Sequence, residues 1–500
     1  MRYPLLPLVA TFAAVVTTCA SPPTTAERAA IAAGRGAALY QRHCAACHGP
    51  DGDGDTAVAH FLLPRPNAFR DGLFKLVSTT NGVPSEDDLV ATLRRGMPGS
   101  TMMSWGWMPE ADLRLLAREV RRLAVRGRAE SIAATAKLAG QPLAPDQALA
   151  QAEQQLLPGP DVDGNVTVPS GADAAAAGAR LWNTHCASCH GEDGRGLPGH
   201  EGLPTDGTWL WPRDLSAGWM RGGASLRELA FRIRAGMPAA HMPPSRLSAA
   251  ETALLANHVR SLISEPTADH HVQWRRTVRA VRVARLPDDG DAAAWAKVEP
   301  VRLPLAPLWW RNDAAFEANL RVVHDGRTIA MQWSWADATR TDRPQPGMAM
   351  GDGLAVQFAQ VQDPPMFAMG SEREPVNVWR WHAYDPKATA GMVDLMAMRH
   401  SGLDVPVDVR PPASAESIEL GGAGSAPSAT GSGLPLHVAR EWTDGRWTAT
   451  FRRDLAARNA HEVDLAVGTP VLFAVAVWDG AHDKHAASKA ITTWHVLALQ

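Results

Sequence analysis

The sequence Cys-x-x-Cys-His occurs twice in this chain, at residues 44–48 and 186–190, and the residues around it are also alike, over 38–49 and 180–191. On a short helix this spacing brings both thiols to one edge of a porphyrin and directs the histidine at its iron, so it predicts covalent haem attachment. A zinc site would need further ligands at suitable spacing, and only one cysteine lies outside the two motifs. The predicted attachment and proximal residues are Cys44, Cys47 and His48 for one haem, and Cys186, Cys189 and His190 for the other.

Each motif is followed later by a Gly-Met-Pro turn and then by a second methionine. The turns contain Met97 and Met237, and the methionines beyond them are Met102 and Met242, at similar distances from their histidines. A methionine thioether is a known sixth ligand of haem iron, although most methionines fill cores. The repeated context predicts Met102 and Met242 as the distal iron ligands. The alternatives are Met97, Met103, Met237 and His241.

Each copy closes with apolar residues at helical spacing, over 110–123 in the first and 249–263 in the second. With the Cys-x-x-Cys-His motif and the late methionine, this order of elements resembles class I cytochrome c over residues 30–125 and 172–265. The resemblance implies two all-α domains, each with a six-coordinate haem c. Met103 stands where this family usually has a proline after the distal ligand.

After about residue 270 the helical spacing gives way to period-two alternation, as in residues 329–335 and 471–478. Several such segments separated by turns predict an all-β, sandwich-like or barrel domain. Twelve of the 18 tryptophans lie in this half, enough to line a deep apolar pocket.

Six ordered segments of this half resemble the haem-binding subunit of the ethylbenzene dehydrogenase family, over roughly 290–500. They are residues 333–340, 353–358, 369–370, 376–381, 478–480 and 489–494. The resemblance implies a β-sandwich that holds one non-covalent haem b between a methionine and a lysine, which fall on Met369 and Lys489. Burial can remove the proton of a lysine and free its lone pair for a metal. The alternatives are Met366, Lys484, His382, His400 and His495.

The expected domain order follows from these segments. It is a cytochrome c domain at 27–128, a linker at 129–170, a second cytochrome c domain at 171–265 and a haem b-binding β domain at 270–500. The linker is rich in alanine, glutamine and proline, which predicts a tether that lets one haem domain move relative to the other.

The N-terminus has the layout of a secretory signal, which we place at residues 1–20. Arg2 precedes an apolar stretch over 5–16 that is too short to span a bilayer. Cys19 partly fits a lipoprotein site, whereas cleavage after Ala20 would remove it. We therefore expect a protein exported to the periplasm, with a lipid anchor at Cys19 left open.

Three six-coordinate haems predict an electron-transfer protein with no catalytic residues of its own. The resemblance implies a molybdoenzyme with an iron–sulfur subunit as one redox partner, and a soluble cytochrome or quinol-linked carrier as the other. No basic run interleaved with aromatics indicates a nucleic-acid partner. Two alternatives remain: a dihaem cytochrome c peroxidase, which needs one open or displaceable distal position, and a haem-based sensor.

Overall fold

The computed structural model describes most of the chain. The described residues are 25–167, 171–196, 203–205, 208–210, 212–263, 269–342, 351–364, 369–371, 373–383, 415–420, 428–429, 436–482 and 489–500. The predicted signal, with Cys19, lies outside them, and so do Met366, His400 and Lys484.

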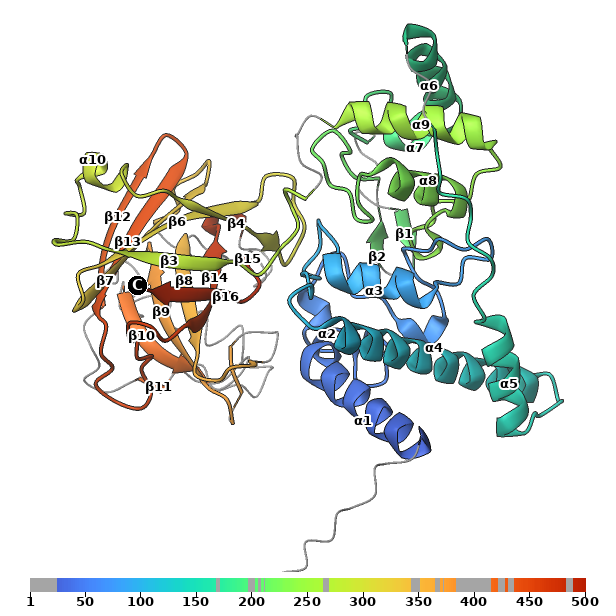
Figure 1. Cartoon of the computed structure of the whole chain (residues 1–500), viewed down its shortest axis with the longest axis horizontal. Coiled ribbons are helices and arrows are strands. Elements are labelled where there is room, and N and C mark those ends of the chain that lie inside the picture. Colours follow the sequence, from blue (N-terminus) through green and yellow to red (C-terminus); the bar gives the residue numbers. More distant parts are fainter. Residues whose placement is uncertain are drawn as a thin grey trace, which may run out of the picture.

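The first cytochrome-like region is helical (Figure 1). Its elements are α1 (Thr25–His43), α2 (Ala45–His48), η1 (Ala59–Phe61), η2 (Phe69–Asp71), α3 (Glu86–Arg95) and α4 (Glu110–Leu138). Helices α1 and α4 pack together around Tyr40, Leu116 and Val120, which are buried. Arg35 and Asp112 join the same two helices through an ion pair of 2.8 Å.

The second region repeats this plan with a smaller core. Its elements are α6 (Ala172–His185), α7 (Ala187–His190), β1 (Leu203–Thr205), β2 (Thr208–Leu210), α8 (Leu226–Ala235), η3 (Pro238–Ala240) and α9 (Ala249–Leu262). Strands β1 and β2 form a short antiparallel hairpin, so this region is not strictly all-α. Threonine and tryptophan are enriched in strands, which agrees with the hairpin.

Helices α3 and α8 show that the repeat extends to local chemistry. Each begins with a capping box, in which Ser85 or Ser225 accepts a hydrogen bond from the amide three residues on. Each ends at a glycine, Gly96 or Gly236, with φ of 71° and 72°. A Cβ on either glycine would come within 2.5 Å of a backbone oxygen, so both positions require glycine.

The segment predicted as a tether lies against the first region. It contains α5 (Pro145–Gln155), which packs on α4, and Arg128 donates a hydrogen bond to Gln155 Oε1 at 2.7 Å. Leu156 and Val162 are buried in the core of the first region, and the Val162 amide bonds to the Ser78 carbonyl at 2.7 Å. Apolar contacts therefore hold this segment, which composition alone indicated to be free.

The C-terminal half is a curled mixed sheet of 14 strands (Figure 1). They are β3 (Thr277–Arg282), β4 (Val301–Pro304), β5 (Ala306–Pro307), β6 (Glu317–His324), β7 (Thr328–Ala336), β8 (Gly353–Ala359), β9 (Val376–His382), β10 (Ala415–Leu420), β11 (Ser428–Ala429), β12 (His437–Thr443), β13 (Arg446–Asp454), β14 (Val471–Trp478), β15 (Lys489–Ile491) and β16 (His495–Leu499). The main path runs β11-β10-β9-β8-β14-β16-β3-β6-β7-β13-β12, in which only the pairings of β3 are parallel. Short helices α10 (Ala292–Trp295) and η4 (Gly480–His482) lie between strands.

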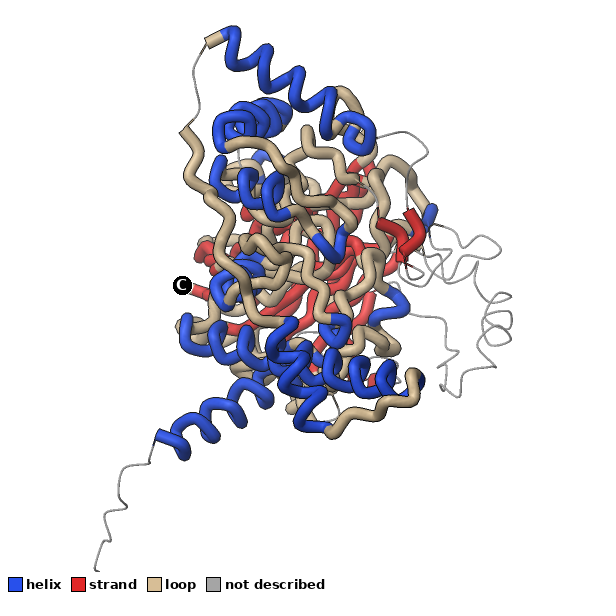
Figure 2. Tube along the Cα trace, turned by 90° about the vertical axis from the view of Figure 1, so that its right-hand side faces the viewer, coloured by secondary structure: helices blue, strands red, loops and turns tan. Residues whose placement is uncertain are grey.

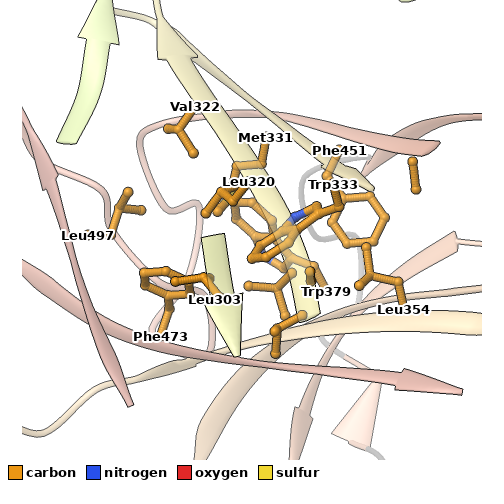
Figure 3. Close-up of a cluster of buried hydrophobic side chains, with 14 of the residues drawn as sticks. Leu303, Leu320, Val322, Met331, Trp333, Leu354, Trp379, Phe451, Phe473 and Leu497 are labelled. Carbon is orange, nitrogen blue, oxygen red and sulfur yellow. The ribbon is translucent and has the colours of Figure 1, made fainter. Parts of the chain in front are cut away.

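The two halves of the curled sheet enclose one core (Figure 3). Trp333 and Phe451 come from one half, and Trp379 and Phe473 come from the other, all fully buried. Alternation along the strands turns a second set of small and apolar residues to the other face of β8, β9, β10 and β14. We call this set the outer-face cluster: Ala355, Ala359, Val376, Val378, Ile418, Leu420, Ala474 and Trp494, with Met369, Leu472 and Trp478 packed against it.

The helical regions lie together on one side of the sheet (Figures 1 and 2). The first region bonds to the β domain through its backbone, where the Leu63 amide donates to the Leu308 carbonyl at 2.8 Å and the Trp310 amide donates to the Leu63 carbonyl at 3.0 Å. Arg42 adds an ion pair with Glu374 at 3.1 Å. The two kinds of domain are therefore in direct contact.

Candidate haem sites

The first motif lies on α2, directly after α1, and its thiols and histidine face an interior space. Cys44 and Cys47 are buried. His48 stacks on Phe69, with ring centroids 4.5 Å apart, and its Nδ1 lies 3.0 Å from the Asn67 carbonyl. Because a carbonyl can only accept, Nδ1 carries the proton and Nε2 keeps the lone pair that an iron needs. Burial lowers the pKa of His48 to about 4, which keeps the imidazole neutral.

His48 and Met102 line one cavity, whose free space, counted together with its opening to solvent, is about 1100 Å³. Its walls are largely apolar and include Phe74, Leu93 and Trp105. A long apolar lining with two thiols and a neutral imidazole suits a large flat cofactor, so the residues present fit a haem c. Met97 also lines the cavity, whereas Met103 is buried and is not among the lining residues.

The loop that carries each predicted distal methionine has the same shape in both regions. The Met97 amide donates to the Met102 carbonyl at 2.8 Å, and the Met237 amide donates to the Met242 carbonyl at 2.9 Å. Gly96 and Gly236 precede these loops. The repeat in sequence is therefore a repeat in backbone geometry.

The second motif, on α7, is more open. Cys186 is half-buried and Cys189 is exposed. His190 lies 5.7 Å from Trp182 between ring centroids, and its Nδ1 has no hydrogen-bond partner among the described residues. Met242 lines a groove of about 720 Å³ between the two helical regions, and His190 is not among the residues described there.

In the β domain, Met369 and Lys489 border the same outer-face cluster. Met369 is half-buried against it, as is Trp478. Lys489 begins β15 and is paired with Trp478 on the neighbouring strand β14. Its Nζ lies 5.7 Å from the Trp478 ring centroid. Burial lowers the pKa of Lys489, which favours the neutral amine that could bind a metal. The outer-face cluster that both residues border is apolar and aromatic, and His382 lies beside it.

Two histidines predicted as alternatives differ in position. His382 is buried 5.6 Å from the Trp478 ring, beside the outer-face cluster, so it remains a rival ligand. His495 lies 5.5 Å from Phe473, which belongs to the enclosed core, and Nδ1 accepts a hydrogen bond from the Arg276 amide at 3.2 Å. His495 therefore faces away from Met369 and Lys489.

Three carboxylates come together in the β domain, two of them from segments that resemble ethylbenzene dehydrogenase subunits and one, Asp352, from the residue just before a third such segment. Asp337, Asp352 and Asp479 place oxygens within 4.8 Å of one another. Asp352 accepts hydrogen bonds from the Thr341 and Gly480 amides at 2.7 and 2.8 Å. Burial and the neighbouring carboxylates raise the pKa of Asp337 to about 7. Through these hydrogen bonds Asp352 connects the segments that follow β7 and β14. No pattern in the sequence indicated this role.

A cluster of cations at the first haem cavity was also missed. Lys75 and Arg221 line that cavity, and Arg213 lies close enough to lower the pKa of Lys75. Lys75 comes from the first region and the two arginines come from the second. No spacing in the sequence connects them, because only the packing of the two regions brings them together.

Family models match three successive parts of the chain. Residues 32–118 match the model of cytochrome c oxidase, cbb3-type, subunit III; residues 175–262 match cytochrome c; and residues 422–490 match ethylbenzene dehydrogenase. The chain therefore combines two cytochrome c segments with an ethylbenzene dehydrogenase-type segment, as the motifs predicted.

Known proteins similar to this chain include a putative respiratory nitrate reductase heme subunit from Haloferax mediterranei. It is 25% identical over 224 residues, which cover 44% of this chain and 70% of that protein. A chain of the Kuenenia stuttgartiensis reducing HAO-like protein complex is 26% identical, with a TM-score of 0.39, and covers 46% of this chain and 96% of its own. A family 9 carbohydrate-binding module from Caldicellulosiruptor kristjanssonii is 9% identical, with a TM-score of 0.27, and covers 45% and 96%.

None of the described helices is both long and apolar enough to cross a bilayer.

Proposed function

From the union of two cytochrome c segments and an ethylbenzene dehydrogenase-type segment in one chain, we propose an exported, periplasmic electron-transfer protein. It relays electrons through two haem c groups and one haem b, and it is not an enzyme by itself. His48 with Met102 and His190 with Met242 are the axial pairs of the two haem c irons. Met369 with Lys489 is the axial pair of haem b.

One contact carries the proposal that these centres form a single relay. Cys47, an attachment residue of the first haem, packs in one cluster with Leu308 and Ile491 of the β domain. Ile491 ends the three-residue strand β15, which Lys489 begins. The Leu308 amide also donates to the Lys489 carbonyl at 2.9 Å. The predicted haem b ligand and the residue that contacts the first haem c attachment therefore lie at the two ends of one three-residue strand.

The residues of the chain perform the positioning that such a relay needs. The Asn67 carbonyl orients His48, and the Gly96 turn sets the position of Met102. Six-coordinate irons supply reversible one-electron chemistry, with potentials set by the axial ligand and by burial. The rigid contact at Cys47 keeps the first haem near the β domain.

The proposed partners are a molybdoenzyme with an iron–sulfur subunit and a soluble cytochrome or quinol-linked carrier. The similarity to a protein described as a respiratory nitrate reductase heme subunit supports a partner of the respiratory reductase class. Membrane attachment through a lipid on Cys19 is a further proposal for the N-terminus.

A pyridine haemochrome assay of the purified protein, before and after acid–solvent extraction, tests the haem content. We expect two haem c groups to remain with the polypeptide and one haem b to be extracted. Met369→Ala and Lys489→Ala should each remove only the extractable haem, whereas Lys297→Ala, at an exposed lysine of the same domain, should retain all three.

The absence of extractable haem from the wild-type protein would remove the third centre from the proposal. A polypeptide with no covalent haem would overturn the whole proposal. Hydrogen peroxide turnover with a high-spin ferric signal would instead support the peroxidase alternative.

A further inference from the structure

The wall of the first haem cavity carries buried positive charge from both helical regions. Lys75, between Phe74 and Leu76, is 9% exposed, and Arg213 is 7% exposed. Lys75 and Arg221 line the cavity itself. The cavity is otherwise largely apolar, so these cations lie where water screens them poorly.

No carboxylate among the described residues forms an ion pair with Lys75 or Arg221. The Nε of Arg221 is buried and has no hydrogen-bond partner in the part of the chain that the structure describes. Burial and the two neighbouring arginines lower the pKa of Lys75 to about 7. Buried charges are normally paired, so an anion would stabilise this group of cations, and the described residues of the chain supply none.

Hydrogen bonds from the second region fix the backbone of the first region next to Lys75. Arg232 of α8 donates to the Val77 carbonyl at 2.6 Å, and the Ala239 amide donates to the Phe74 carbonyl at 3.1 Å. These two hydrogen bonds hold the backbone on both sides of Lys75 in the sequence. Arg213 donates to the Gly99 carbonyl at 2.6 Å, in the loop that leads to Met102.

Arg213 also ties this arrangement to the β domain. Its guanidinium carbon lies 3.7 Å from the centroid of the Trp310 ring. The first cytochrome region, the second cytochrome region and the β domain therefore meet beside this wall of the first haem cavity.

We infer that Lys75 and Arg221 together bind the propionate carboxylates of the first haem, so that the second cytochrome region completes the site of the first. Ammonium and guanidinium groups form strong charge-assisted bonds to carboxylates, and a haem brings two of them. The inference rests on the proposed covalent haem at Cys44 and Cys47. It extends that proposal by making the first haem a link between two regions of the chain.

The test measures the midpoint potential of the first haem in the full-length holoprotein. The background variant Met242→His removes the sulfur–iron band of the second haem, so that the remaining band reports the first. In this background, Arg221→Gln and Lys75→Gln should each lower the potential of the first haem, because a propionate without its cation stabilises the ferric state. Arg246→Gln, at an exposed arginine of the second region, should leave it unchanged.

Resonance Raman spectra supply a second reading, since the propionate bending mode of the first haem should shift in both variants. Arg221→Lys keeps the charge and should restore most of the potential, which separates loss of the cation from loss of folding. Unshifted potential and unshifted propionate mode in both Gln variants would overturn the inference while leaving the proposed relay intact. Loss of covalent haem from wild-type protein would instead overturn the relay.

If Lys75 and Arg221 bind a soluble anion and not the propionates, the midpoint potential of the wild-type protein should change with the concentration of inorganic phosphate. A phosphate dependence that disappears in the Gln variants would therefore also overturn the inference.

Discussion

The two cytochrome regions carry the same attachment motif in opposite surroundings. Cys44 and Cys47 are buried, at a cavity that also has contributions from the second region, whereas Cys189 is exposed. The motif predicts that a haem is attached, and the neighbouring domains set how much solvent would reach it. Because low exposure disfavours the ferric charge, we expect the first haem to have the higher potential and the second to react faster with external reductants.

The largest expected effect comes from removing each haem in turn. The double change of Cys44 and Cys47 to alanine should leave the first haem cavity empty. Loss of a large buried side chain costs about 3–5 kcal/mol, so the free energy of unfolding should fall by at least that amount. The same change at Cys186 and Cys189 should cost less, because that site is more open. Thermal unfolding followed by circular dichroism measures the stability of both double variants. Equal losses of stability would contradict the expected difference between the two haem sites.

Replacement of the distal methionines should sharpen the comparison. Met102→Ala and Met242→Ala should each erase one sulfur–iron charge-transfer band and lower the potential of one haem. His241 lies next to Met242 and can replace it as ligand, so the second site should stay low-spin and the first should become high-spin. Absorption and electron paramagnetic resonance spectra report both outcomes. Met97→Ala and Met237→Ala are the controls, and loss of a band in either would reassign that ligand.

The pH dependence of stability should differ between the regions when the first haem is missing. The pKa of Lys75 is lowered to about 7 in the folded chain by burial and by nearby arginines, against about 10.4 when unfolded. The unfolded state then binds more protons, so the free energy of unfolding should rise from pH 7 to pH 10, by about 3–4 kcal/mol.

Urea unfolding of the Cys44/Cys47 double variant across this pH range measures that slope. Adding Lys75→Met to this variant should remove the pH dependence of its stability. The pH dependence should also be absent from the holoprotein, because a propionate beside Lys75 keeps the lysine protonated. A pH dependence that persists with haem bound would contradict propionate binding at Lys75.

The smallest expected effect concerns the ion pairs that Arg42 of the first region makes with the β domain, which the matching residue of the second region does not make. Arg42 pairs with Asp363 at 2.9 Å and with Glu374 at 3.1 Å. Thr184, at the matching position, donates to the Arg180 carbonyl of its own helix and has no ion pair with the described part of the β domain. Arg42→Thr should cost about 0.5–1 kcal/mol, as partly exposed ion pairs do. Differential scanning calorimetry should show slightly less coupled unfolding of the two domains. Thr184→Ala is the control, and an equal effect there would contradict the assignment.

Some features of the sites were predictable because they depend on short spacing. The attachment motifs, the matching methionine loops and the change from helical to strand periodicity are local patterns, and the structure has helices and a β sheet in the expected halves. The linker was harder to predict. Its composition indicates a tether, yet Leu156 and Val162 are buried in the first region, and no local pattern reveals the partners of two isolated apolar residues.

The sequence by itself determined that two haems are expected at equivalent positions, because their attachment chemistry needs only five consecutive residues. It also indicated Met369 and Lys489 through a resemblance. Only the tertiary structure decided that Cys47 meets Leu308 and Ile491, and that Lys75 shares a cavity wall with Arg221. Those contacts join residues far apart in the chain, and burial, which sets their charge and pKa, exists only after the domains have packed.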